Sequence, residues 1–154
     1  AAACRKLADC LQTLSYPAAV SAKTGDASRW SGRTWQVADN PAGIRTLGIR
    51  FADGGAELEI GFADVTQRIV IGHGEWRTGE LRIAGMSLPT AACGRWIRRN
   101  VYEIELRYLD QAFHDRLTCH FVDNRLKVSA ARNVWIAPGL SDAWLLPDLY
   151  AESK

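Results

Sequence analysis

The chain has 154 residues, of which 47% are hydrophobic and 23% charged, as is typical of one soluble globular domain. Its formal net charge of +2 lacks the basic excess of nucleic-acid-binding domains, so we expect no nucleic-acid partner. We also expect no signal peptide and no membrane partner, because the first residues are partly charged and no apolar run approaches the ~20 residues of a membrane span.

Residues 1–16 have the pattern of an amphipathic helix. Apolar side chains, among them Leu7 and Leu14, fall on one helical face and polar ones on the other. Pro17 ends this pattern. Residues 17–32 are rich in Ala, Ser and Gly and have no periodicity, which predicts a linker.

From Arg33 onward, apolar and polar side chains alternate with the period of half-buried β-strands. We predict strands at residues 33–37, 47–51, 56–62, 67–71, 101–109, 116–121, 126–128 and 132–136, with tight turns at Asp53-Gly54 and Asp123-Asn124. The glycine-containing stretch 72–83 predicts two short strands around Thr78-Gly79, and residues 86–94, which contain Pro89, predict a loop. Residues 140–154 predict an irregular tail.

These patterns predict a mainly β fold that follows one N-terminal helix. The half-polar alternation fits antiparallel strands with one wet face, and the short connections leave no room for crossover helices. So many consecutive strands must close into a barrel or stack as a sandwich, since either arrangement removes exposed edges. We place this β-domain at residues 33–139.

Several segments carry a resemblance to a known domain type. They are Asn40-Pro41-Ala42-Gly43-Ile44, Gly74-Glu75-Trp76-Arg77-Thr78-Gly79, Tyr102-x-Ile104-x-Leu106-Arg107, Phe113-His114-Asp115-x-Leu117-Thr118, Phe121-x-Asp123-x-Arg125-Leu126 and Asn133-Val134. Together they resemble the accessory domain that follows the catalytic domain in serine hydrolases related to β-lactamases and penicillin-binding proteins. The resemblance implies a lipocalin-like, up-and-down antiparallel barrel of about eight strands, with the catalytic serine in the preceding domain. Gln111-Ala112 departs from the Thr-Pro that the family often has there.

The residue patterns of catalysis and metal binding are missing from the sequence. No serine is followed three residues later by lysine, as the nucleophile motif of that superfamily requires. Lys23-Thr24-Gly25 spells a second superfamily motif, but it lies in the predicted linker, where we interpret it as a turn. The histidines and the four cysteines have no metal-ligand spacing, so we predict no catalytic residue, metal ligand or cofactor. His114 and Asp115 are neighbours in the sequence, and they are a candidate for a hydrogen-bonded pair at the start of a strand.

Three of the six tryptophans are the candidate ligand-binding residues. Trp35, Trp76 and Trp135 lie in or beside predicted strands, and side-chain packing is the simplest role for them. Alternatively they line a pocket at the barrel mouth for a small hydrophobic ligand. Cys119 is predicted to be a free, buried thiol. The basic stretch 95–100 is predicted to be a solvated rim whose arginines pair with Glu103, Glu105 or a neighbouring domain.

Three functions follow as hypotheses. The chain is an accessory domain that packs on the preceding catalytic domain of the same chain and shapes its cleft, and is not itself an enzyme. Alternatively it is an independent, lipocalin-like binder of a small ligand, or a free-standing enzyme, which the missing motifs disfavour. The first hypothesis predicts an apolar patch near Ala1–Leu14 or the Trp144 tail and a barrel filled by side chains. The second predicts an open cavity lined by tryptophan and a few polar groups. The sequence assigns no cellular compartment.

Overall fold

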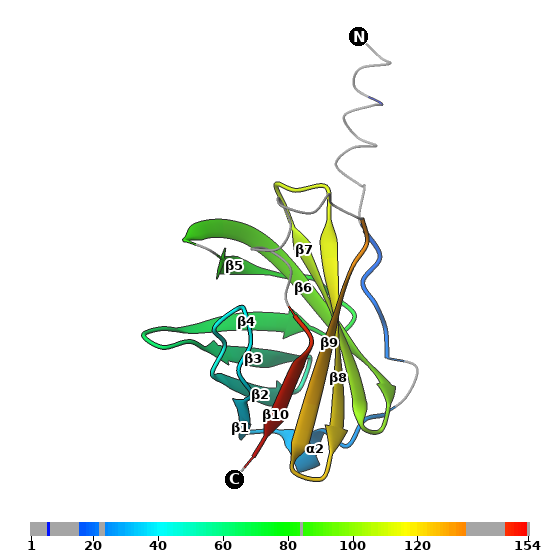
Figure 1. The fold of residues 1–154 in the computed structure, drawn as a ribbon. Helices are drawn as coiled ribbons and strands as arrows, with labels where there is room; N and C mark the ends of the chain where they lie inside the picture. The colour runs from blue at the N-terminus through cyan, green and yellow to red at the C-terminus, as the bar shows by residue number, and fades with distance from the viewer. Residues whose placement is uncertain (1–5, 7–15, 22–23, 84, 135–146, 154) are drawn as a thin grey trace.

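The computed structural model describes residues 6, 16–21, 24–83, 85–134 and 147–153. These residues form one ten-stranded sheet and one four-residue helix, α2 (Ala27–Trp30) (Figure 1). None of the helices in these ranges is long and apolar enough to cross a membrane. The strands are β1 (Arg33–Val37), β2 (Thr46–Ala52), β3 (Gly55–Gly61), β4 (Thr66–Gly72), β5 (Arg77–Ile83), β6 (Met86–Arg98), β7 (Val101–Tyr108), β8 (His114–Val122), β9 (Arg125–Arg132) and β10 (Leu149–Glu152).

The sheet closes into a nine-stranded barrel. The strand order is β4-β3-β2-β1-β10-β9-β8-β7-β6-β5, and a further pairing of β4 with β6 closes the ring. This closing pairing is parallel, whereas the other ladders are antiparallel, and β5 pairs with β6 beyond the point of closure. The prediction of a mainly β barrel is therefore confirmed. The predicted barrel was antiparallel and had about eight strands, whereas the observed one is mixed and has nine.

Side chains fill the interior of the barrel. The inward positions of β7 and β8 alternate with outward ones as predicted, so that Tyr102, Leu106 and Phe121 are almost completely buried. One void between Ile60 and Leu117 has a volume of about 20 Å³. A water molecule occupies roughly 30 Å³ in the liquid, so this void is too small for an organic ligand.

Strand β6 occupies the stretch that was predicted to be a loop. Its residue Pro89 pairs with Glu80 of β5, and its carbonyl accepts a hydrogen bond from the Leu109 amide. In an antiparallel strand the N–H and C=O of one residue face the same neighbouring strand, so the nitrogen of Pro89, which carries no hydrogen, faces β7. It lies just beyond the Tyr108 end of the β6–β7 ladder. Proline is therefore tolerated, and the loop prediction is wrong. The predicted interruption at Thr78-Gly79 is also wrong, because β5 runs through it.

The C-terminal strand β10 is a second correction. An irregular tail was predicted for residues 140–154, but Leu149–Glu152 pair with β9 on one side and β1 on the other. Leu149 and Ala151 are buried in the core, so this strand completes the barrel wall. The end of the predicted strand at 132–136 and residues 140–146 lie outside the described residues.

The N-terminal part of the chain lies against the barrel. Of the helix predicted at 1–16, only Lys6 and Tyr16 belong to the described residues. The segment predicted to be a linker contains α2, and it contacts β6 through a hydrogen bond of 3.0 Å from the Trp96 amide to Ser21 Oγ. A strap made of the described residues 16–21 and 24–26 thereby lies on the outer face of β6, where Cys93 is completely buried.

Candidate functional site

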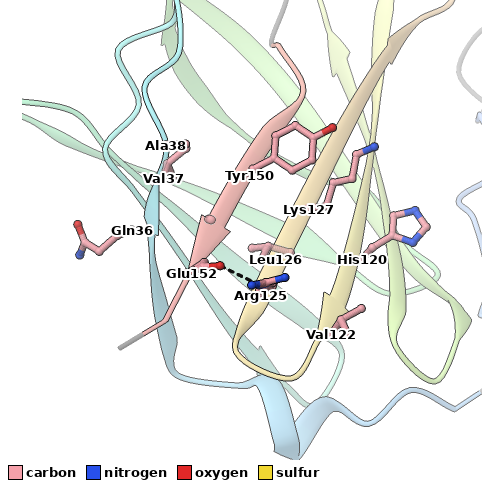
Figure 2. A pocket seen from close by; sticks show the side chains of 11 residues that line it. Gln36, Val37, Ala38, His120, Val122, Arg125, Leu126, Lys127, Tyr150 and Glu152 are labelled. Carbon is pink, nitrogen blue, oxygen red and sulfur yellow. Dashed lines mark hydrogen bonds and ion pairs between the residues drawn. The ribbon is translucent and has the colours of Figure 1, made fainter.

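A groove of about 970 Å³ lies on the outer face of the barrel, over β1, β10, β9 and β8 (Figure 2). Its lining residues are Gln36, Val37, Ala38, His120, Val122, Arg125, Leu126, Lys127, Tyr150, Ala151 and Glu152. The volume is within the ~300–1,000 Å³ typical of ligand clefts. The groove is open to solvent and separate from the filled interior.

The alternation of β9 and β10 places the groove side chains. Leu126 and Ala151 point into the core, so their neighbours Lys127 and Tyr150 project outward. The two strands pair in register, Tyr150 opposite Lys127 and Glu152 opposite Arg125. Both cross-strand pairs therefore meet on the outer face, as Figure 2 shows.

The charged side chains of the groove form ion pairs. Arg125 Nε lies 2.8 Å from Glu152 Oε1, and Lys127 Nζ lies 3.7 Å from Asp148 Oδ2 and 5.2 Å from the centre of the Tyr150 ring. Exposed pairs of this kind contribute at most about 1 kcal/mol to stability. Their effect on the groove is to balance its charge locally.

Apolar groups remain exposed between these pairs. Tyr150 is 57% exposed and Val122 is 54% exposed, and both line the groove. Tyrosine and arginine, which both line the groove, are enriched in protein interfaces. Chemically, the groove can bury apolar surface and donate or accept hydrogen bonds through His120 and Gln36.

The three candidate tryptophans do not form a common pocket. Trp35 is completely buried, and its ring centre lies 5.7 Å from that of Phe121, so it is a core residue. Trp76 lies between β4 and β5, and its Nε1 donates to the Tyr16 carbonyl at 2.9 Å. No ring contact joins Trp35 and Trp76 within the described ranges, and Trp135 lies outside them.

The Trp76 ring belongs to a small surface cluster. It packs edge-on against Tyr16 with ring centres 6.0 Å apart, and the Arg107 guanidinium lies 3.5 Å from the centre of the Tyr16 ring. Cation–π contacts of this kind contribute roughly 0.5–1 kcal/mol at exposed sites. The cluster anchors the beginning of the strap to β7 and to the β4–β5 connection.

Other predicted residues have structural surroundings. Arg95 pairs with Glu103 at 2.7 Å, which confirms one of the expected partners of the basic stretch. Cys119 is a free, buried thiol as predicted, and burial raises its pKa to about 12. Thr24 and Gly25 of the K-T-G sequence lie in the strap, and Lys23 lies outside the described residues. No group of three or more potential metal ligands occurs in the part of the chain that the structure describes.

A buried ionic cluster at the other end of β8 was not predicted. Asp115 is completely buried and accepts two hydrogen bonds from Arg132, at 2.7 and 2.8 Å, and one from the Tyr108 hydroxyl at 2.8 Å. Burial, and then the Asp115 charge, raises the pKa of Tyr108. His114 points outward, 3.9 Å from Glu105, so His114 and Asp115 do not form a pair. The sequence contained a signal, because Asp115 shares the inward phase of Leu117.

No protein-family model matches the chain, and a search of curated proteins finds no significant match. The fold and the site therefore define a small β-barrel domain of nine strands, without evidence for a family.

Proposed function

We propose that the chain is a non-catalytic accessory domain that docks on a second protein domain through the groove over β1, β10, β9 and β8. The observation that carries this proposal is the exposure of Tyr150 and Val122 between paired charges in a groove of about 970 Å³. Docking would gain from burial of the two apolar groups, and because the charges around them already have partners, none would become an isolated buried charge.

The filled interior supports docking over ligand storage. A small-ligand carrier of lipocalin type needs a cavity inside the barrel. Here Trp35 and Phe121 occupy the core at one end, and the void near Ile60 measures about 20 Å³. The alternative function, an independent lipocalin-like binder, would have to place its small hydrophobic ligand in the outer groove.

The partner that we propose is the catalytic domain of a serine hydrolase related to β-lactamases, preceding this domain in the same chain. The sequence resemblance supports this identity, and the lipocalin-like description of the barrel rests on the same motifs. Their apolar members Leu106, Leu117 and Phe121 lie in the core, so the motifs carry a structural resemblance and no catalytic group. The docking proposal stands independently of the partner's identity.

The docking test measures binding of the barrel to the domain encoded upstream in the same reading frame. The two domains are expressed separately and their affinity is measured by isothermal titration calorimetry. The double variant Tyr150→Ser/Val122→Ser is expected to weaken binding at least tenfold, since truncated interface hot spots cost about 2 kcal/mol or more. Val70→Ser is the matched control, because Val70 is 51% exposed on β4, outside the groove.

Each result bears on one part of the proposal. If the groove variant binds as tightly as the Val70 control, docking through the groove is refuted. If no folded domain is encoded upstream, the proposed partner in the same chain is refuted. A partner that binds through the groove but lacks an S-x-x-K motif refutes the hydrolase identity and leaves docking intact.

A further inference from the structure

The barrel closes at a seam between β4 and β6 that consists of one residue pair. Gly72 pairs with Cys93 in parallel orientation, and no further pair of this ladder forms among the described residues. The adjoining β3–β4 ladder, in contrast, runs from Gly55–Gly72 to Gly61–Thr66 without interruption. One backbone pair is a weak connection, so side chains must contribute to holding the seam.

His73, the residue after Gly72, supplies a second connection. Its Nε2 lies 2.8 Å from the hydroxyl of Tyr102 on β7, and its backbone N–H donates to the Gly54 carbonyl at 3.0 Å. The Tyr102 hydroxyl reaches this point next to Gly94 of β6, where a Cβ atom would lie only 2.1 Å from it. The His73–Tyr102 hydrogen bond therefore crosses β6 and ties the end of β4 to β7.

We assign the donor in this bond from the burial of Tyr102. Tyr102 is completely buried, and His73 is the hydrogen-bond partner of its hydroxyl within the described part of the chain. A buried hydroxyl needs an acceptor for its proton, so Tyr102 donates and Nε2 of a neutral His73 accepts. A proton on Nε2 would remove that acceptor and place a positive charge beside a buried ring, which costs free energy twice.

We infer that the His73–Tyr102 hydrogen bond is a pH-sensitive latch, which holds the β4–β6 seam closed when His73 is neutral and loosens it when His73 is protonated. Burial lowers the pKa of His73 below its ordinary value of 6.5, in agreement with this assignment. The unfolded chain then binds the proton more tightly than the folded one, so the latch contributes full stability above pH 6.5 and loses it as the pH falls.

Within the described residues, no ion pair with His73 offsets its protonation. The carboxylate of Glu75, the nearest in the chain, is already paired with Arg77 at 2.5 Å. The groups that face or adjoin His73 from the neighbouring elements are Glu75 in the β4–β5 connection, Arg77 on β5, Asp53 in the β2–β3 turn, the Cys93 thiol on β6 and Tyr102 on β7.

The test is hydrogen exchange of the folded chain between pH 7.5 and 5, with rates corrected for the intrinsic pH dependence of exchange. In the wild type we expect the protection of amides 72–73 and 93–94 to fall at least tenfold, while the β2–β3 ladder stays protected. His73→Gln, which is neutral at every pH, is expected to abolish this response. The matched control His120→Gln, at an exposed position on β8, is expected to keep it.

The wild type also provides a measurement that does not depend on a variant. The ring signals of His73, followed by NMR, should titrate with a midpoint below pH 6.5, and the protection at the seam should be lost between pH 6.5 and that midpoint. A His73 midpoint at or above pH 6.5, an unchanged seam down to pH 5, or the same pH response in His73→Gln would each overturn the latch.

Discussion

The buried ion pair of Asp115 and Arg132 should contribute more to stability than the exposed ion pairs, and a substitution at Asp115 tests this. Asp115→Asn keeps the shape of the side chain but removes the charge that faces the Arg132 guanidinium. The exposed fractions of the two side chains are 1% and 5%, so water cannot replace the lost charge. One of the two carboxylate oxygens becomes an amide NH₂, which cannot accept from Arg132 or Tyr108. Breaking a buried pair from one side typically costs ~3–5 kcal/mol.

This cost can be measured by urea unfolding at pH 7 followed through tryptophan fluorescence. With a slope of roughly 2 kcal/mol per M, the midpoint should fall by about 1.5–2.5 M at an unchanged slope. Arg125→Gln, which breaks the exposed pair with Glu152, is the control and should cost no more than ~1 kcal/mol. Equal, small losses in the two variants would refute the argument that burial makes the Asp115 pair different.

Two further substitutions test the closure of the barrel. Leu149→Ala should destabilise the fold by ~2–5 kcal/mol in the same urea assay, because Leu149 is 4% exposed on β10. Tyr150→Ser, on the outer face of that strand, should change the free energy of unfolding little. Equal effects of the two variants would contradict the role of β10 in the core. Gly94→Ala should lower the free energy of unfolding by ~1–3 kcal/mol, measured by thermal denaturation, because the added Cβ would clash with Tyr102. Gly79→Ala should be tolerated, because the nearest atom to its added Cβ is 4.0 Å away. A well-tolerated Gly94→Ala would contradict the close approach of Tyr102.

Strands with a clear local period were predictable from the sequence. The alternation in β7 and β8 follows from burial of one face, and it correctly placed Ile104, Leu117 and Phe121 in the core. The hairpin turn at Asp53-Gly54 was also predictable, because Gly54 has a φ of +79°, which favours glycine. Both signals are local, since they depend on neighbours in the sequence.

The missed elements depend on partners that are distant in the sequence. β6 contains Pro89 and small residues such as Ala91 and Ala92, which resemble a loop until ladders form on both sides. β10 has four residues, too few to show a period, and it becomes a strand because β9 and β1 leave a place between them. The groove combines outward residues of four strands, so no contiguous sequence motif could have predicted it.

The location of the groove follows from how the core is filled. Trp30, Trp35, Trp96, Tyr102 and Phe121 pack around one end of the barrel, with ring centres of neighbouring pairs 5.1–6.1 Å apart. Large rings at this density leave the interior to side chains, so the docking that we propose uses the outer face. There the outward residues of most strands form ion pairs, as Arg95 and Glu103 do, and the groove combines its pairs with two exposed apolar side chains, Tyr150 and Val122. Because the interior is filled, the strands below this surface are supported by the core, so the proposed docking would order mainly exposed side chains, which limits its entropic cost.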